Sequence, residues 1–579
     1  MNNHHRIPKQ LLPVAFALLL ASCAQTPKKL VLIAANASPT VEFKLIAFND
    51  FHGNLKTPSL RIPVADSSQS TGIRFENAGG VEQFAAVVAG LKAKNPNNVV
   101  VSAGDMVGAT PLLSALFNDE PTIEAMNLVG LDFHAVGNHE FDYGVAHLQR
   151  LKNGGCAIDS KTNQPDCKGR APYQGASFEF LAANVVVDAT QKTLFPAYGV
   201  KQFGGADGVK VAFIGLTLQG TPAIVRPGGA AGLTFLSEVE TVNKLVPQLR
   251  AEGIEAIVVV MHEGAQQSGG INECADFAGP AFDISEKFHP AVSVVVTAHS
   301  HRYYICNIAG RLITSAGSYG TLVTEIDITL DKKTKKVIAK NAKNIIVSPD
   351  GPKATALTAL VEQYAKLSEP LENRVVAYMK QEITQVTNAA GESTLGNLIA
   401  DAHLFATSSP DKGGAVIAFN NPGSLRAPII PNADGGVSYG TLFKTQPFQN
   451  DLIIMNLTGA QIKLLLEQQL ASRFGERASL LGVSAGFSFT WDSQKPRGSR
   501  VVAESIKLNG RPIQPDLQYR VAANSYIAGG SEGLTVMAEG TERQVSVLDL
   551  EALTIFLAKS TINQPYMPPP TGQRIKRIN

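Results

Sequence analysis

Polar side chains suited to metal binding or acid–base chemistry follow several separate apolar segments in the first half of the chain. The segment FHAVG, residues 133–137, is followed at once by NHEFD, which carries an amide, an imidazole and two carboxylates. One such stretch alone is typical of a polar turn with a helix cap. The pattern recurs, however, and the donors that it supplies are Asp50, His52, Asp105, Asn138, His139, His262, His299 and His301. This recurrence favours a metal site over a set of unrelated turns.

The apolar segments that precede these donors have the character of buried strands. They span residues 43–49, 98–104, 133–137, 254–261 and 292–298. Several are continuously apolar, as strands buried on both faces tend to be. Segments of helical spacing lie between them, at 81–94 and 239–253. The alternation predicts an α/β arrangement, which periodicity alone suggests is one open sheet. Because ligands bind at the carboxyl ends of strands in such sheets, we expect the donors to meet at one edge.

The donor types indicate which metals would suit the site. Apart from His139, the set has two carboxylates, one amide oxygen and four imidazoles, a mixed shell without a thiolate. Such a shell suits Zn, Mn, Co or Fe better than Ca, and the sequence does not choose among these four. Seven donors are too many for one four-coordinate ion, so we expect two divalent metal ions that share a carboxylate. Ion pairs of this kind clamp the attacking and leaving oxygens in phosphoryl displacement and lower the pKa of bound water.

The first residues are typical of a targeting segment. A polar, partly basic start precedes LLPVAFALLL, an apolar run too short to span a bilayer. The run ends in Leu20-Ala21-Ser22-Cys23, which resembles a bacterial lipobox, with Cys23 as the site of lipidation. The alternative is an ordinary secretory signal with a chance cysteine. We expect a lipoprotein signal peptide at 1–22, a tether at 23–40, and an exported protein anchored by lipid to a bacterial membrane, in the periplasm or at the cell surface.

Four further cysteines remain, an even number that suits disulfide formation in an oxidising compartment. They are Cys156, Cys167, Cys274 and Cys306, and they lack the CxxC spacing of a zinc site. Four cysteines allow three pairings. We expect Cys156–Cys167, which would close a short polar insert, and Cys274–Cys306, which would join a loop near His262 to one after His301.

Length and pattern predict two domains. At 579 residues the chain exceeds what one hydrophobic core usually supports. The glycine-free piece TALTALVEQYAKLSEPLENRV has helical spacing, and we expect a linking helix at 349–374. It would separate a first domain at 41–348 from a second, mixed α/β domain at 375–579. The formal charge of +2 at pH 7 gives no reason to expect a nucleic-acid polymer as partner, and nothing indicates an oligomeric state.

The order of the motifs carries a resemblance to a known family. DFH, GD, GNHE, an isolated His after a strand and an HxH loop resemble the motifs of calcineurin-like metallophosphoesterases. With its second half, the whole mature chain resembles the exported 5′-nucleotidase family, relatives of UDP-sugar hydrolase and 2′,3′-cyclic-nucleotide phosphodiesterase. The resemblance implies an N-terminal four-layer αββα metallophosphoesterase domain with two sheets, followed by a C-terminal α/β 5′-nucleotidase domain that binds substrate.

The resemblance also assigns roles to the donors. It implies one ion held by Asp50, His52, Asp105 and His301, and another held by Asp105, Asn138, His262 and His299, with Asp105 bridging. His139 and Asp142 match the family's catalytic His-Asp pair. In that role the imidazole, oriented by Asp142, stabilises charge on the transferring phosphoryl group while a metal-activated water attacks.

Segments of the second half resemble the family's substrate-binding loops. They are GESTLGNLIADA, NNPGSLRAPI, TQPFQND and NSYIAGGSEG, and the resemblance implies ligand contacts from Asn421, Arg426, Phe448, Tyr526 and Glu532. Two aromatic rings can hold a base between them, a contact worth about 1–3 kcal/mol per base. An arginine offers a planar fork for phosphate or ribose oxygens. The chain departs from the family at Gly391, Tyr526, Ser531 and Glu532, so the resemblance specifies the reaction better than the nucleotide.

The resemblance therefore implies a 5′-nucleotidase that releases nucleoside and phosphate. Two alternatives use the same metals: a 2′,3′-cyclic-nucleotide phosphodiesterase, and a UDP-sugar or nucleoside-diphosphate hydrolase. A non-enzymatic alternative is a surface lipoprotein that binds nucleotides or a partner. The presence of all seven expected metal ligands and of the His-Asp pair opposes that last alternative.

Overall fold

The structure is a computed structural model that describes residues 39–579 apart from 59, 70–71, 159–163, 168–171, 227 and 472–478. All elements below belong to the unit Thr40–Asn579. The expected signal peptide, Cys23 and nearly all of the tether lie outside the described residues. None of the helices in the described part of the chain combines the length and the hydrophobicity that a membrane span requires.

The first half of this unit contains a six-stranded sheet in the order β19-β18-β1-β4-β5-β8. Its strands are β1 (Thr40–Phe48), β4 (Asn98–Ser102), β5 (Phe133–Ala135), β8 (Glu179–Leu181), β18 (Leu322–Asp331) and β19 (Val337–Ile346). Strands β1, β4, β5 and β8 run parallel, so their carboxyl ends lie at the same edge. Strands β18 and β19 complete the sheet in antiparallel register.

A second six-stranded sheet has the order β11-β12-β14-β15-β17-β16. Its strands are β11 (Tyr198–Phe203), β12 (Val209–Thr217), β14 (Ala256–His262), β15 (Val292–Val296), β16 (Tyr303–Ile308) and β17 (Arg311–Ala316). The four central strands are parallel, and antiparallel strands form both edges. Side chains from the two sheets share one apolar core, which includes Phe43, Val101, Phe213 and Val258.

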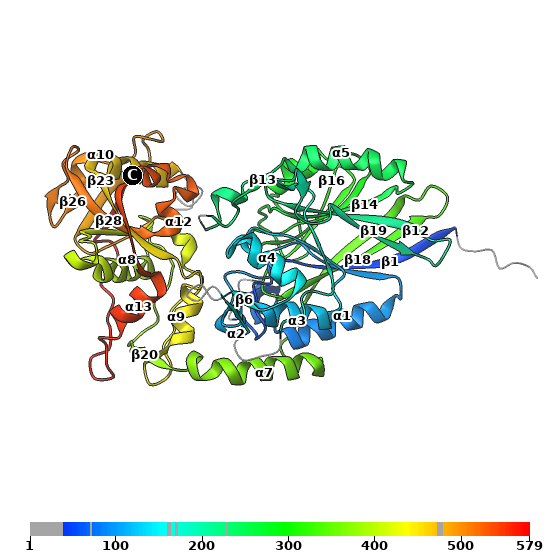
Figure 1. The fold of residues 1–579 in the computed structure, drawn as a ribbon, viewed down its shortest axis with the longest axis horizontal. Helices are drawn as coiled ribbons and strands as arrows, with labels where there is room; N and C mark the ends of the chain where they lie inside the picture. The colour runs from blue at the N-terminus through cyan, green and yellow to red at the C-terminus, as the bar shows by residue number, and fades with distance from the viewer. Residues whose placement is uncertain are drawn as a thin grey trace, which may run out of the picture. The chain divides into compact units, whose positions relative to one another are not determined.

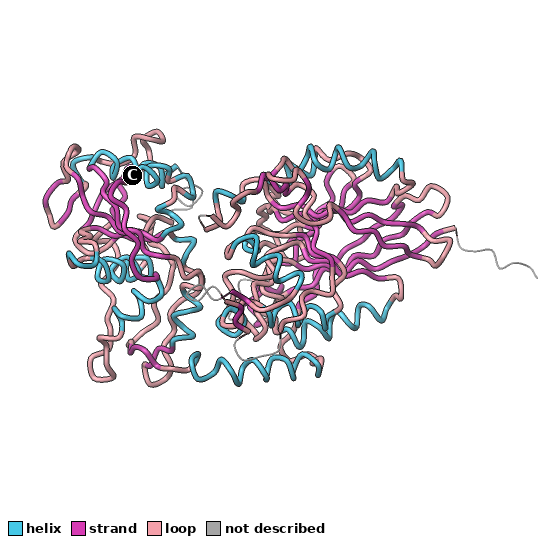
Figure 2. Tube along the Cα trace, viewed as in Figure 1, coloured by secondary structure: helices cyan, strands magenta, loops and turns pink. Residues whose placement is uncertain are grey.

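Helices cover the outer face of each sheet (Figures 1 and 2). The first sheet packs on α1 (Val81–Lys94), α3 (Glu120–Val129), α4 (Gly144–Asn153) and α7 (Thr355–Glu372). The second packs on α5 (Glu238–Ala251) and α6 (Pro280–Glu286). The four-layer αββα arrangement implied by the family resemblance is therefore confirmed. The single open sheet suggested by periodicity is wrong, because strands buried on both faces look alike whichever sheet they join.

Shorter elements complete this half. They are β2 (Arg61–Ala65), β3 (Ile73–Asn77), α2 (Leu112–Ala115), η1 (His139–Phe141), β6 (Ala157–Ile158), β7 (Pro165–Asp166), β9 (Val185–Val187), β10 (Lys192–Thr193), η2 (Thr221–Ala223) and β13 (Leu233–Phe235). The structure pairs Cys156 with Cys167 and Cys274 with Cys306, the two pairings expected from the sequence.

The helix expected between the two halves is present as α7. Its residues Leu357, Val361 and Tyr364 belong to the same core as α1 and α3. The Tyr364 hydroxyl also donates a hydrogen bond to Glu124 at 2.9 Å. The helix is therefore packed on the first half rather than free between the two.

The second half is built on a five-stranded sheet in the order β24-β21-β28-β23-β29, with a four-stranded sheet β27-β26-β25-β30. Their strands are β21 (Ile417–Asn420), β23 (Asp451–Thr458), β24 (Gly482–Val483), β25 (Phe487–Asp492), β26 (Lys507–Leu508), β27 (Arg511–Pro512), β28 (Gln518–Asn524), β29 (Thr541–Leu548) and β30 (Ile575–Ile578). Among the described residues of this half, the other α-helices and short strands are β20 (Val375–Tyr378), α8 (Thr394–Thr407), β22 (Gly436–Ser438), α9 (Tyr439–Thr445), α10 (Gly459–Ala471), α12 (Ser525–Ala528) and α13 (Asp549–Leu557). Both sheets contribute to one core with α10.

Two acidic residues of the GESTLGNLIADA segment form hydrogen bonds with residues at the start of β30 and just before it. The two carboxylate oxygens of Asp401 accept two hydrogen bonds of 2.8 Å from the Arg574 guanidinium. The Glu392 carboxylate accepts the backbone N–H groups of Gly572 and Ile575 at 2.8 and 3.2 Å. These family-like positions therefore hold the second half together and do not line the cavity described below.

The start of α13 generates a prediction about stability and pH. Asp549 is fully buried, and its carboxylate accepts hydrogen bonds from the Asn450 side chain at 3.1 Å and the Leu550 N–H at 2.8 Å. Burial raises the pKa of Asp549 from 3.8 to about 7. Since the folded pKa lies above the unfolded one, the stability that this group contributes is fully present below about pH 4. It is lost as pH rises through about 7.

We therefore expect Asp549→Asn to gain stability relative to the parent protein as pH rises from about 4 to 7, by on the order of a few kcal/mol. Urea unfolding followed by Trp491, the single tryptophan and part of the second-half core, measures this difference. The exposed Asp434→Asn variant is the control. A difference between Asp549→Asn and parent that does not change with pH would contradict the prediction.

Candidate active site

Donor side chains from both sheets converge at the carboxyl ends of the parallel strands. The first sheet supplies residues after β1, β4 and β5, namely Asp50, His52, Asp105 and Asn138. The second sheet supplies His262, the last residue of β14, and the residues after β15, His299 and His301. The ligand atoms form two groups, Asp50 with His52 and His301, and Asp105 with His262 and His299. Within each group these atoms lie within 4.8 Å of one another. The convergence predicted from the strand ends is therefore present, but between two sheets rather than along one.

The Asp105 carboxylate lies between the two groups. Its Oδ2 is 3.1 Å from Nε2 of His262 in its own group and 3.7 Å from Nε2 of His52 in the other. Its Oδ1 accepts the backbone N–H of His139 at 2.9 Å, which fixes the orientation of the carboxylate. The amide oxygen of Asn138 completes the second group, at 3.1 Å from His262 Nε2 and 3.0 Å from His299 Nδ1.

The imidazoles turn ring nitrogens toward this centre. Nδ1 of His52 lies 2.8 Å from the Gly108 carbonyl, and Nδ1 of His262 lies 2.8 Å from the Ala103 carbonyl. Because a carbonyl oxygen only accepts, each Nδ1 carries a proton and each Nε2 is the ring nitrogen that faces the centre. Although burial opposes a charged imidazole, the carboxylates of Asp105 and Asp50 raise the pKa of His262 to about 10, so without a cation its Nε2 carries a proton as well. Nε2 of His52 is also 3.2 Å from Nε2 of His301. Carboxylate, amide and imidazole groups thus crowd around one centre, where a divalent cation would take the place of the proton on His262 Nε2, so these residues fit divalent cations.

Burial makes the charges of this centre costly without a cation. Burial raises the pKa of Asp50 to about 7 and lowers the pKa of His52 to about 3. Burial also opposes ionisation of Asp105, yet the imidazoles of His262 and His139 hold the pKa of that carboxyl well below its usual range. Isolated buried charges are strongly disfavoured unless they are paired or coordinate a metal. A bound cation would stabilise the ionised carboxylates and the neutral imidazoles together.

The backbone of the donor loops is strained. Five of the donors have φ between +45° and +63°, the left-handed region that side chains rarely adopt: Asp50, His52, Asp105, His299 and His301. Each such residue costs on the order of 1–3 kcal/mol and persists only where its surroundings hold it. Gly104 shows how closely the loops approach, because a Cβ there would lie 2.5 Å from His262 Nδ1. The strain clusters at the donors, as it does at functional sites.

His139 and Asp142 form a pair beside the donors. Nδ1 of His139 lies 2.7 Å from Oδ2 of Asp142. Although burial opposes a charged imidazole, the carboxylates of Asp142 and Asp105 raise the pKa of His139 above its usual value. The pair can therefore present a cationic, oriented imidazole to an anionic ligand.

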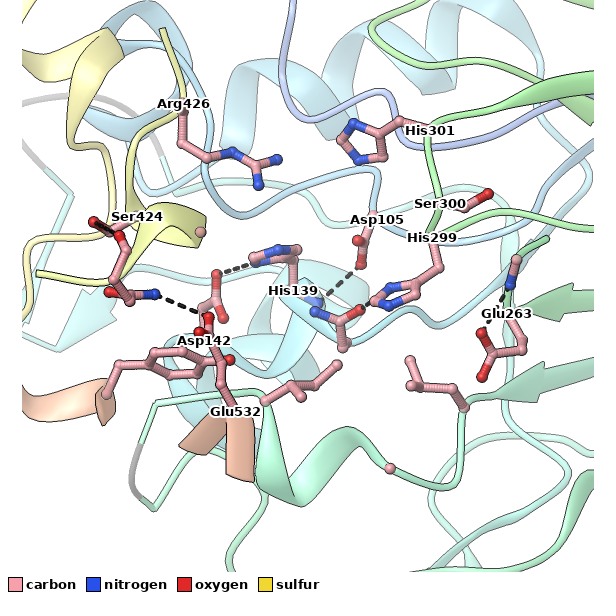
Figure 3. Close-up of a pocket in the computed structure, with 18 of the residues that line it drawn as sticks. Asp105, His139, Asp142, Glu263, His299, Ser300, His301, Ser424, Arg426 and Glu532 are labelled. Carbon is pink, nitrogen blue, oxygen red and sulfur yellow. Dashed lines mark hydrogen bonds and ion pairs between the residues drawn. The ribbon is translucent and has the colours of Figure 1, made fainter. Parts of the chain in front are cut away.

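A cavity of about 740 Å³ opens beside this centre (Figure 3). Its lining includes both members of the His-Asp pair and four of the donors, Asp105, Asn138, His299 and His301. It also includes all five predicted second-half residues, Asn421, Arg426, Phe448, Tyr526 and Glu532. The remaining donors, Asp50, His52 and His262, are fully buried and are not part of the lining.

Two contacts organise the second-half side of the cavity. The Phe448 ring stacks on the His139 imidazole, with centroids 5.6 Å apart, and the Arg426 guanidinium lies 5.7 Å from the Phe448 centroid. The Asn421 amide donates to the Glu532 carboxylate at 3.0 Å. Glu532 adopts a φ of +59°, so the turn that carries its carboxylate is strained.

Part of the cavity wall was not expected from the sequence. It comes from the loop after β12, with Leu218, Gly220, Ile224 and Arg226, and from Glu263–Gln266, Gly279 and Pro280. The apolar stretch VKVAFIGLT forms β12 and is followed by polar and glycine residues. The same strand-end pattern that located the donors would have located this loop.

Known proteins share both halves of this arrangement. The family model for calcineurin-like phosphoesterase matches residues 43–303, and that for the 5′-nucleotidase C-terminal domain matches residues 373–539. The endonuclease YhcR of Bacillus subtilis (strain 168) is 30% identical over 84% of this chain and 37% of its own length. A cell wall protein of Listeria monocytogenes is 29% identical over 87% of this chain and 65% of its own length. The chain thus spans about a third and about two thirds of these relatives.

Matches over nearly the full length also exist. A 5′-nucleotidase of Diplobatis ommata is 24% identical over 88% of both chains. The crystal structure of a 5′-nucleotidase precursor from Thermus thermophilus superposes with a TM-score of 0.71 and 26% identity, covering 93% of this chain and 99% of that one. With both domain models in the order that the structure displays, the chain belongs to the calcineurin-like phosphoesterases that carry a 5′-nucleotidase C-terminal domain.

Proposed function

We propose that this chain is a metal-dependent hydrolase of nucleotide phosphate esters, a 5′-nucleotidase that releases nucleoside and phosphate. The observation that carries the proposal is the place of Asp105 Oδ2 between two groups of convergent, buried donors. A carboxylate in that place suits a bridge between two cations. When bound, such cations supply an activated water and neutralise charge on the phosphoryl group.

The proposed ligand sets follow the two groups. Asp50, His52, Asp105 and His301 would hold one ion, and Asp105, Asn138, His262 and His299 the other. The nitrogen and oxygen donors suit Zn, Mn, Co or Fe. Hydrogen bonds from backbone to the donors support the sets, since the His299 N–H donates to the Asp50 carboxylate at 3.0 Å and ties one group to the other.

His139 is the proposed catalytic residue that contacts the phosphoryl group. Its Nδ1–H donates to Asp142, so the proton on Nε2 is available to a phosphoryl oxygen at the cavity wall. The raised pKa of His139 favours the charged imidazole, which opposes the negative charge that develops during transfer. Asp142 acts through His139 and is a positioning residue.

The second half is proposed to bind the nucleotide. Arg426 offers two parallel N–H donors to phosphate, and Asn421 and Glu532 offer polar contacts to ribose or base. Phe448 and Tyr526 line the same cavity and are proposed to bind the base. Because Phe448 stacks on His139 in this structure, that imidazole already occupies one face of the Phe448 ring.

The domain boundaries and the location are proposals of the same kind. The matched segments 43–303 and 373–539, with α7 between them, support a catalytic domain at 41–348 and a nucleotide-binding domain at 375–579. The lipobox-like sequence supports a signal peptide at 1–22 and lipid attachment at Cys23. Two disulfides suit an exported protein.

A hydrolysis panel tests the reaction. Purified protein is given AMP, ADP, ATP, UDP-glucose and 2′,3′-cyclic AMP, with and without a chelator and then with Mn or Zn restored, and products are separated by chromatography. We expect activity that the chelator abolishes and metal restores, greatest on AMP. Preference for a diester or pyrophosphate substrate would favour the phosphodiesterase or UDP-sugar alternative. No hydrolysis of any substrate with metal restored would contradict an enzymatic function.

Replacement of His139 tests its role. His139→Ala should lower turnover of the preferred substrate by on the order of a hundredfold or more, because a positioned donor to the phosphoryl group is lost. Metal content, measured by elemental analysis, should stay at the parent value. His289→Ala, a histidine outside the donor groups, is the matched control and should keep parental turnover. Parental turnover in His139→Ala would show that the imidazole has no catalytic role.

A further inference from the structure

We propose that Glu140 is a positioning residue for the metal centre, which gathers the backbone N–H groups of the two loops that carry Asp105 and Asn138. This inference rests on the proposed metal centre but concerns a residue to which no role has yet been given. Glu140 lies between the two members of the His-Asp pair in the GNHEFD stretch. Unlike Asp142, its carboxylate does not face the cavity, and it is not part of the cavity lining.

The Glu140 carboxylate is almost completely buried and accepts four backbone N–H groups. Its Oε2 accepts the N–H of Asp105 at 3.0 Å and that of Gly137 at 2.6 Å. Its Oε1 accepts the N–H of Met106 at 2.7 Å and that of Val107 at 3.3 Å. Three of these groups belong to the loop after β4, and one belongs to the loop after β5. A single side chain therefore joins the two loops from the first sheet that serve the second donor group.

These hydrogen bonds act on the donors themselves. Asp105 is the residue placed between the two groups, and its left-handed φ of +50° is one of the strained conformations of the site. Its N–H is held by Glu140 while its own Oδ1 accepts the N–H of His139. Gly137 directly precedes Asn138 in the chain. These two hydrogen bonds fix the backbone at Asp105 and just before Asn138. They thereby fix the positions from which the Asp105 carboxylate and the Asn138 amide extend.

The loops after β4 and β5 approach each other so closely that a side chain at Gly137 would not fit between them. A Cβ at Gly137 would lie 2.3 Å from Asp105 Oδ1 and 2.9 Å from Glu140 Oε2. Behind the carboxylate lies His134 of β5, whose Nε2 is 3.4 Å from Glu140 Oε1. Its Nδ1 is 3.2 Å from the Ser102 hydroxyl at the end of β4. The carboxylate is thus enclosed by β4, β5 and their loops, and backbone N–H groups occupy both of its oxygens.

Glu140 is therefore assigned to orientation rather than to coordination. Among the described residues, neither group of converging donors includes it. Charge-assisted hydrogen bonds from backbone N–H to a buried carboxylate are short and strong, and they suit a rigid support. Partners that orient metal ligands in this way typically contribute tenfold to a hundredfold to metal affinity.

The test uses Glu140→Gln in the full chain. The amide keeps the shape but replaces one acceptor oxygen with an NH₂ group that faces a backbone N–H. We expect the affinity for Zn²⁺, measured by competition with a chromogenic chelator, to fall by about tenfold or more. The visible absorption bands of the Co²⁺-loaded protein, which report ligand geometry, should shift. Glu140→Asp keeps both oxygens on a shorter side chain and should fall between Glu140→Gln and the parent in affinity.

The matched control is Glu467→Gln. Glu467 is also a buried glutamate, and its carboxylate accepts the N–H groups of Arg500 at 3.0 Å and Val501 at 2.7 Å in the second half. The same chemical change there should lower stability without altering Zn²⁺ affinity or the Co²⁺ spectrum. A purely structural role for Glu140 predicts the same behaviour in both variants.

Parental Zn²⁺ affinity and an unchanged Co²⁺ spectrum in folded Glu140→Gln would overturn the proposal. If that variant does not fold, the same result in Glu140→Asp would overturn it. Because the readouts are metal affinity and spectrum, they do not depend on hydrolysis of any substrate. A parent protein that binds metal but hydrolyses no nucleotide would overturn the proposed function and leave the role of Glu140 to be decided by its own variants.

Discussion

The crowding of hydrogen-bond acceptors around Asp105 is the constraint on which the rest of the structure depends. Carboxylate oxygens, an amide oxygen and imidazole nitrogens lie about one hydrogen-bond length apart, and the carboxylates among them raise the pKa of His262 to about 10 although burial opposes its charge. Such an assembly repels itself unless positive charge lies among its atoms. The two sheets, the buried loops and the strained φ values all maintain an arrangement that would otherwise spread apart. The fold of this domain therefore holds together the groups that a cation would bind.

The two-sheet architecture explains how such an assembly can form at all. Each sheet delivers donors from the carboxyl ends of parallel strands, where loops are free to vary without disturbing the core. The shared apolar core holds the two edges in register, so that His262 from one sheet reaches Asp105 from the other. Hydrogen bonds to backbone carbonyls then select the imidazole tautomers. Rigidity at the strands and strain in the loops together give a preorganised centre.

Much of this centre could be predicted from the sequence because each donor lies at the end of a recognisable strand or within a few residues after it. Asp105 after NVVVS and His262 at the end of AIVVVMH are examples in which local pattern and position agree. The assignment of strands to two sheets could not be predicted from periodicity, because a continuous apolar run indicates a buried strand but does not indicate which sheet the strand joins. The structure decides this by pairing β14 with β12 and β15 and not with β1, β4 or β5.

The roles of individual site residues depend on three-dimensional contacts that the spacing of residues in the sequence does not reveal. Glu140 and Asp142 are both carboxylates beside His139, yet one accepts four backbone N–H groups and the other orients the imidazole. The three-residue spacing between His139 and Asp142 suits a helical turn, whereas the partners of Glu140 lie more than thirty residues earlier except for Gly137. The stacking of Phe448 on His139 likewise joins residues from different halves of the chain.

The most direct test of this account is anomalous X-ray diffraction from crystals of the protein grown with Zn²⁺ or Mn²⁺ and measured at the metal's absorption edge. The account predicts two peaks about 3.5–4 Å apart, one within each donor group, with the Asp105 carboxylate in contact with both. A single peak under metal-replete conditions, or peaks that do not contact Asp105, would contradict it.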